Sequence, residues 1–398
     1  MVHILSNQRR EEFLSGNCIA RFEMCMDDDI GRPTLYIKSG IIDLYFVTKN
    51  DCLTLDILNV DNDLIVYIIS VDEGEKTPLY LYSSIETLSE KHALESIALG
   101  SQFDVILFND FAIEIARATG LYHGTSLSNK HLKTFSPKGP DFLGVNANRV
   151  STAVSAYLDG EGIVGTGCLA LSNFESASTS ILISDGGESM KIHGFTSATL
   201  VHESLPQIIT DHTSLKFVHS PNVEVSSDKT REFSDAIILG ADALLSFQAK
   251  CFDFEGDILP TKRSNAEKRM QKNIKKAISQ TKGSSRMIRQ GKTILSNGVA
   301  IDIPPETRIT FGIFIPSLDL VSSELQSELV GLGEQLIDYE QNLVVLDPMQ
   351  FLRTIQAAEN VFHRLDCSID EAFFILIERN SQDAINTGIY SRQILYRW

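Results

Sequence analysis

Two apolar runs separated by a short turn dominate the middle of the chain. The first is FSDAIIL (residues 233–239) and the second is ALLSFQAKCF (residues 243–252), with Gly240, Ala241 and Asp242 between them. Apolar runs of this length around a glycine-containing turn predict a β-hairpin. This hairpin is the best-defined element that the sequence offers, and the polar residues on it suggest a functional site.

The polar residues of the predicted hairpin should meet at one edge of the sheet. A strand alternates its faces, so Gln248 and Lys250 point to the same side, and Asp235 on the first strand can lie opposite them. Mg²⁺ prefers oxygen ligands, which Asp235 and either the Gln248 side chain or the Ala249 carbonyl can supply. A metal bound there would lower the pKa of a water molecule, and Lys250 could orient or deprotonate that water and stabilise a charged transition state.

The spacing of these residues resembles a known nuclease signature. Asp235 is followed by twelve residues and then by Gln248-Ala249-Lys250, which resembles the motif of the PD-(D/E)XK, restriction-endonuclease-like superfamily. The Q-x-K form is similar to Mrr-type restriction enzymes, and the E-F-S-D-A-I-I lead-in resembles the NERD nucleases. The resemblance covers about residues 195–320. It implies an endonuclease that uses Mg²⁺ or Mn²⁺ to hydrolyse DNA, in prokaryotic restriction or anti-phage defence.

The segments on either side of the hairpin fit the same resemblance. The superfamily has a helix before its first core strand, and here FTSATLVHESLPQII (195–209) places Glu203 at the position of a further metal ligand, although Pro206 interrupts that helix. A helix follows the Q-x-K strand, and here AEKRMQKNIKKAISQTKGSS (266–285) carries Gln280, where related sequences often have a glutamine. The run RITFGIFIPS (308–317) would complete the small sheet.

Charge is distributed very unevenly along the chain. The whole chain carries −17, but residues 261–292 contain eleven basic residues and a single acidic one, Glu267. A local basic segment on an acidic chain is typical of phosphate-backbone contact, and the alternative is a solvated helix face. We expect DNA contacts from the following residues of this segment: Lys275, Lys276, Gln280, Lys282 and Arg286.

The remaining sequence predicts three further regions around the nuclease-like domain of residues 193–320. Residues 1–120 predict an α+β domain, with antiparallel strands in residues 33–82, a helix over 84–99, a strand at FDVILFND (103–110) and a helix at FAIEIARATG (111–120) that Gly120 should end. Residues 121–192 are expected to be a linker (121–146) followed by a segment of weak signal, with a helix at NRVSTAVSAYL (148–158) and a short strand at SILISD (180–185). Residues 321–398 are expected to be a mainly helical C-terminal extension with a strand at NLVVLD (342–347), and Pro348 and Ser368 mark the starts of two of its helices. The expected fold is therefore a multidomain combination of α/β and α+β parts.

Composition limits the possible location and partners. None of the six cysteines forms a C-x-x-C pair, and they are too sparse for a disulfide framework, so a reducing cytoplasm fits them best. No signal peptide and no membrane span are expected. The expected partners are DNA, a helicase, an ATPase or another defence protein, and a second copy of the chain. The alternative function is a catalytically silent nucleic-acid-binding or scaffold protein, with the N-terminal domain as a sensor or partner-binding module in either case.

Overall fold

The computed structural model of the chain forms two compact units, one made of Met1–Phe195 with Pro260–Arg263 and the other of Thr196–Leu259 with Ser264–Trp398. Both units combine helices with β-sheets, in agreement with the expected mixture of α and β structure. The structure describes residues 12, 19–27, 30–60, 63–109, 114–124, 132, 134–137, 146–176, 178–182, 189–193, 205–226, 229–250 and 262–390.

The first unit is built on a nine-stranded sheet, in which eight strands follow the order β1-β2-β6-β7-β8-β3-β4-β5 and β9 pairs with β7. All neighbouring strands are antiparallel except β2 and β6, which are parallel. A separate hairpin is formed by β10 and β11. The elements of this unit are β1 (Ile19–Asp27), β2 (Ile30–Lys38), α2 (Ile41–Lys49), β3 (Cys52–Val60), β4 (Leu64–Val71), β5 (Leu79–Ser84), α3 (Leu88–Ala98), β6 (Phe103–Phe108), β7 (Glu114–His123), α5 (Ala147–Leu158), β8 (Ile163–Leu171), β9 (Glu175–Ser176), β10 (Ser178–Leu182) and β11 (Ser189–His193).

The two outer strands of this sheet approach each other, so the sheet is strongly curled. The Tyr67 hydroxyl on β4 donates a 2.9 Å hydrogen bond to the Ala20 carbonyl on β1, and Arg21 donates a 2.7 Å bond to the Ser84 carbonyl on β5. The rings of Phe22 and Tyr67 pack edge to face at 5.4 Å inside the curl. The seam between β1 and β5 is therefore closed by side chains and not by a backbone ladder.

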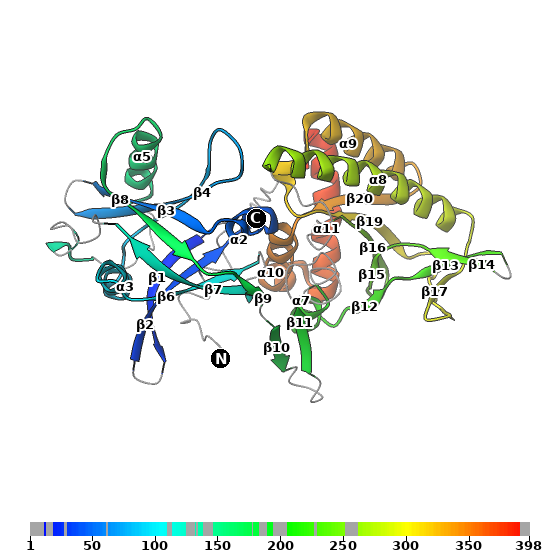
Figure 1. Cartoon of the computed structure of the whole chain (residues 1–398). Helices are drawn as coiled ribbons and strands as arrows, with labels where there is room; N and C mark the ends of the chain where they lie inside the picture. The colour runs from blue at the N-terminus through cyan, green and yellow to red at the C-terminus, as the bar shows by residue number, and fades with distance from the viewer. Residues whose placement is uncertain are drawn as a thin grey trace. The chain divides into compact units, whose positions relative to one another are not determined.

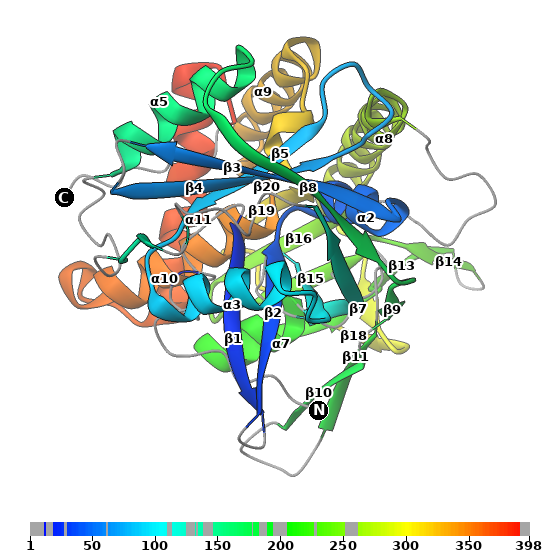
Figure 2. The same cartoon turned by 60° about the vertical axis from the view of Figure 1, so that its left-hand side comes forward.

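Helix α5 packs on β3 and β4 (Figure 2). Its buried Val154 contacts an apolar cluster that includes Leu58 and Val66. At the edge of this cluster, the Tyr157 hydroxyl donates a 2.6 Å hydrogen bond to Asp56, whose carboxylate is buried. Burial, together with this bond, raises the pKa of Tyr157 to about 12.

Two predictions for this unit are wrong. Residues 41–49, which we expected to continue the strands, form the helix α2, because a short run that is apolar on every side does not distinguish a strand from a buried helix. The predicted helix over 111–120 is, in its described part, the strand β7. Gly120 does not end a helix. A side chain there would collide with the ring of Phe103, since a Cβ would lie 2.3 Å from its Cζ atom.

The expected helix over 148–158 is confirmed as α5, and the expected short strand at 180–185 is, in its described part, the end of β10, whereas β8 was not predicted. Residues 121–192 contain α5 and β8, and β8 lies between β7 and β3 in the large sheet. The signal for β8 is weak because its sequence, IVGTGCLAL, contains two glycines, a residue type that is unfavourable in strand interiors. One of them, Gly167, lies against the Tyr122 ring, where a Cβ would come within 2.1 Å of the ring.

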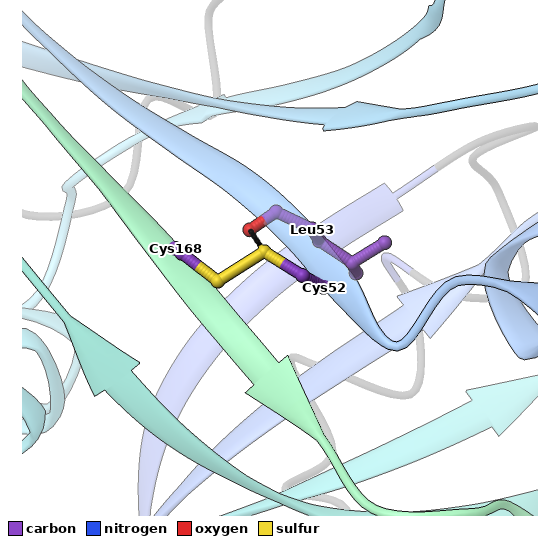
Figure 3. Close-up of a disulfide and its surroundings, with 3 residues drawn as sticks. All are labelled: Cys52, Leu53 and Cys168. Atoms are coloured by element: carbon purple, nitrogen blue, oxygen red, sulfur yellow. Dashed lines mark hydrogen bonds between the residues drawn. A yellow bond between two sulfur atoms is a disulfide. The ribbon is translucent and has the colours of Figure 1, made fainter.

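A disulfide joins two neighbouring strands of this sheet. Cys52 begins β3 and Cys168 lies on β8, and their Cα atoms are 6.0 Å apart (Figure 3). Among the cysteines that the structure describes, Cys25 and Cys367 remain thiols. The disulfide differs from our expectation of reduced cysteines throughout the chain.

The second unit contains a five-stranded sheet with the order β12-β15-β16-β19-β20. Strands β12, β15 and β16 are antiparallel neighbours, whereas β19 and β20 continue the sheet parallel to β16. A smaller sheet has the order β14-β13-β17-β18. The elements are α7 (Leu205–His212), β12 (Lys216–His219), β13 (Asn222–Ser226), β14 (Lys229–Glu232), β15 (Ala236–Leu239), β16 (Ala243–Ala249), α8 (Arg263–Arg289), β17 (Ile294–Ser296), β18 (Val299–Ala300), β19 (Arg308–Phe314), α9 (Ser323–Ile337), β20 (Gln341–Leu346), α10 (Pro348–Leu365) and α11 (Ile369–Thr387).

Helices cover both faces of the five-stranded sheet (Figure 1). On one face, Ser285 of α8 donates a 2.6 Å hydrogen bond to the Gln341 side chain on β20. On the other face, Phe247 of β16 packs edge to face on Phe351 of α10 at 6.1 Å, and Phe351 packs on Phe373 of α11 at 5.8 Å. This two-sided burial explains why β16 and β19 read as continuous apolar runs.

The C-terminal region belongs to this unit, and its predicted strand at residues 342–347 corresponds to β20. Strand β20 pairs with β19 in register, and α10 and α11 bury the aromatic face of the sheet. The predicted helix starts are confirmed: Pro348 occupies the first turn of α10, and the Ser368 side chain caps α11. Across the described ranges, no helix is both long and apolar enough to span a lipid bilayer.

Candidate functional site

The site lies where β15 begins and β16 ends. Asp235 immediately precedes β15, and its backbone N–H donates a 3.0 Å hydrogen bond to the Phe247 carbonyl on β16. On the far side, the Lys250 N–H donates a 2.8 Å bond to the Phe314 carbonyl of β19. Asp235 and Lys250 are thus positioned by backbone bonds to central strands.

Asp235 and Lys250 are in direct contact, as the hairpin predicted. Lys250 Nζ lies 3.3 Å from Asp235 Oδ2 and donates a 3.0 Å bond to the Ala249 carbonyl. The same Oδ2 accepts a 2.6 Å hydrogen bond from the Ala249 N–H. The Asp235 side chain is 25% exposed and that of Lys250 is 12% exposed. Both bonds to the carboxylate end on Oδ2, so Oδ1 is the oxygen that can face a cation.

Gln248 is more deeply buried than either partner, with 4% exposure. Its Nε2 donates a 3.3 Å hydrogen bond to the Phe233 carbonyl, which also accepts a 2.6 Å bond from the Ser284 hydroxyl on α8. A carbonyl can only accept, so Phe233 fixes which end of the Gln248 amide is nitrogen. The Gln248 Oε1 atom is buried and has no hydrogen-bond partner among the described residues. Buried polar atoms are nearly always satisfied, and a cation or a water molecule could satisfy this oxygen.

The arrangement combines two oxygen donors with one ammonium. Asp235 Oδ1 and Gln248 Oε1 are of the type that Mg²⁺ and Mn²⁺ bind in proteins. The third expected ligand, Glu203, lies outside the described residues. Within the described residues, no group of three or more histidine, cysteine, aspartate or glutamate side chains could hold a metal. The described part of the site therefore fits a hard cation only in part, through one carboxylate and one amide.

The basic segment forms the outer face of α8. One stripe of the helix is buried and includes Met270, Ile274 and Ala277. Eight basic residues of the helix are exposed, on the side away from that stripe: Lys268, Arg269, Lys272, Lys275, Lys276, Lys282, Arg286 and Arg289. The helix is amphipathic, so these charges are displayed together on one surface.

The residues expected to hold DNA do not share one environment. Lys276, Lys282 and Arg286 are exposed. Lys275 is exposed but paired with Glu324 at 3.0 Å and Glu328 at 3.5 Å on α9. The hydrogen bond to Glu324, with the charges of both carboxylates, raises the pKa of Lys275.

Gln280 differs from the exposed lysines because its side chain is half-buried. Its Oε1 atom is buried and has no partner among the described residues, and the same is true of the Thr281 hydroxyl. Gln280 therefore does not present its amide oxygen to solvent as the basic side chains of α8 present their charges.

Sequence reasoning missed Ser284 and the Phe233 carbonyl. Ser284 belongs to a group of small polar residues, with Thr281 and Ser285, in the buried stripe of α8. Small hydroxyl residues on the apolar side of a helix usually bond to a neighbouring backbone or side chain, so their spacing was a usable signal. The Phe233 carbonyl has no signal in the sequence.

The chain matches no protein-family model, no curated protein and no solved structure. Function must therefore be inferred from the site and from the charge of α8.

Proposed function

We propose that the chain is a metal-dependent endonuclease that hydrolyses DNA phosphodiesters at the site formed by Asp235, Gln248 and Lys250. The observation that carries the proposal is the 3.3 Å contact between Asp235 Oδ2 and Lys250 Nζ, together with the buried Oε1 of Gln248, two residues earlier in the chain, which has no hydrogen-bond partner among the described residues. Oxygen donors next to an ammonium complement both a divalent cation and a phosphate.

Each residue has a separate role in the proposed reaction. Asp235 and Gln248 would hold the cation, with Glu203 as a further ligand, and the chemistry that a cation would supply there is a water of lowered pKa and compensation of the phosphate charge. The Asp235 carboxylate and the Ala249 carbonyl hold the Lys250 side chain in place. From there, Lys250 orients the attacking water and stabilises the negative charge that develops on the phosphodiester.

The order of elements around the site supports the proposal. The order is a helix (α7), the strands β12, β15 and β16, a second helix (α8) and the parallel strand β19, with β13 and β14 inserted after β12 and β17 and β18 inserted after α8. The resemblance to PD-(D/E)XK nucleases implies a helix before the first core strand, and a helix and strand after the Q-x-K strand. The exposed basic residues of α8 support DNA as the substrate, because contacts to the phosphate backbone need positive charge and no sequence readout.

A cleavage assay with the full chain tests the proposal. We expect cleavage of plasmid DNA with Mg²⁺, none with EDTA, and a loss of about 10²- to 10³-fold in Lys250→Ala, comparable to the loss of one transition-state donor. Lys216→Ala is the matched control, since Lys216 is exposed on β12 of the same sheet. Equal cleavage by wild type and Lys250→Ala would exclude this site. DNA binding without cleavage would favour the alternative of a catalytically silent nucleic-acid-binding protein.

A charge-reversal variant tests the DNA surface separately. Changing Lys276, Lys282 and Arg286 to Glu should weaken binding to unrelated DNA sequences equally. It should also flatten the slope of log affinity against log salt by about 0.9 for each phosphate that the variant no longer neutralises. Lys216→Glu should leave the slope unchanged. An unchanged slope in the triple variant would place the DNA path on another surface.

A further inference from the structure

The disulfide of the first unit connects strands that are already held together by their backbones. In the antiparallel register of β3 and β8, Cys52 pairs with Ala170 and Thr54 pairs with Cys168, so the two cysteines are diagonal neighbours on one face. Strand β3 also pairs with β4, and β8 pairs with β7. The sheet therefore does not depend on the sulfur–sulfur bond, and its backbone can accommodate both the disulfide and the dithiol.

The pair is accessible to reagents in solution. Cys52 is exposed and Cys168 is half-buried. The Sγ atom of Cys52 lies 3.8 Å from the Leu53 carbonyl oxygen, which can accept from the thiol of the reduced form (Figure 3). His123 on β7, also exposed, lies directly opposite Cys168 in the register of β7 and β8. A neighbouring imidazole is one of the groups that make a cysteine more reactive toward disulfides.

We propose that Cys52 and Cys168 form a reversible dithiol–disulfide site that reacts with small disulfides such as glutathione disulfide. In oxidation, the exposed Cys52 thiolate attacks glutathione disulfide, forms a mixed disulfide and releases one glutathione thiolate. The Cys168 thiolate then attacks Cys52 Sγ, closes the protein disulfide and releases the second. The two cysteines lose two electrons and glutathione disulfide gains two. Reduction by glutathione follows the same steps in reverse.

Thiol counting on the full chain tests this site. The chain has six cysteines. The folded protein is treated with dithiothreitol or with glutathione disulfide and is then denatured for alkylation of its thiols. We expect six alkylated thiols after dithiothreitol and four after glutathione disulfide. Peptide mass spectrometry should assign the difference to Cys52 and Cys168. Excess reduced glutathione should restore six thiols while circular dichroism shows the protein folded. Cys52→Ser should abolish the two-thiol change, whereas the controls Cys25→Ser and Cys367→Ser should keep it.

The disulfide should also change stability measurably. It spans 116 positions of the chain, and a crosslink of this kind should lower the unfolding equilibrium constant by about 30- to 1,000-fold relative to the reduced protein. Three results would each overturn the proposal: six thiols after oxidation, a disulfide that reduced glutathione leaves intact in the folded protein, or glutathione retained on Cys52 beside a reduced Cys168. None of these results depends on nuclease activity.

Discussion

Substitution of Asp235 should separate the structural role of this residue from its role in the site. Its Oδ2 accepts a 2.6 Å hydrogen bond from the Ala249 N–H and contacts Lys250 Nζ at 3.3 Å. A hydrogen bond to a charged group contributes about 1.5–3 kcal/mol. Asp235→Ala loses both interactions and leaves the Ala249 N–H without its acceptor, so we expect a loss of about 2–3 kcal/mol in the free energy of unfolding. Asp235→Asn keeps an oxygen acceptor and loses only the charge, for which we expect about 1 kcal/mol.

Activity should not follow the same order as stability. Both variants remove the carboxylate, so both should lose Mg²⁺-dependent cleavage by a similar factor although Asp235→Asn stays the more stable. Urea unfolding followed by circular dichroism gives the stabilities, and plasmid cleavage gives the activities. Asp242→Asn is the matched control, because Asp242 is 59% exposed in the turn of the same hairpin. Cleavage at the wild-type rate by Asp235→Asn would refute a role for this carboxylate in metal binding.

Two further predictions concern the cores of the two units. Tyr157→Phe removes the 2.6 Å bond to Asp56 and should destabilise the first unit by about 1–3 kcal/mol. Burial, with the bond to Asp56, raises the pKa of Tyr157 to about 12. The contribution of the neutral Tyr157 hydroxyl to the free energy of unfolding is therefore complete below about pH 10 and is lost as the pH rises through 12. Absorbance at 295 nm should show several late-titrating tyrosines, among them the buried Tyr390, and Tyr157→Phe should remove one of them. Gly312→Ala would place a Cβ 2.5 Å from the Phe247 ring and should cost about 1–3 kcal/mol in thermal or urea unfolding; wild-type stability would show that the ring moves aside without cost.

The sequence predicted best those elements whose pattern is local. Apolar runs and capping residues were enough to predict the hairpin of β15 and β16, the helix α8 and the starts of α10 and α11. The errors fell on α2 and β7, where a short segment is buried by neighbours that are distant in the sequence. In β7, Gly120 looked like a helix stop, yet it is required by the position of the Phe103 ring. Such a requirement arises only when β6 and β7 are paired.

The sequence was enough to predict which residues meet at the candidate site, but not how the Gln248 amide is oriented there. The alternation of β16 and the turn at Gly240 were enough to bring Lys250 to Asp235. They could not show which end of the Gln248 amide is bonded within the protein, because this depends on the Phe233 carbonyl and on Ser284 from a different element. That detail determines the chemistry. A nitrogen left without a partner would repel a cation, whereas the bond from Nε2 to Phe233 leaves the buried Oε1 as a free acceptor among the described residues, an atom type that a cation can bind.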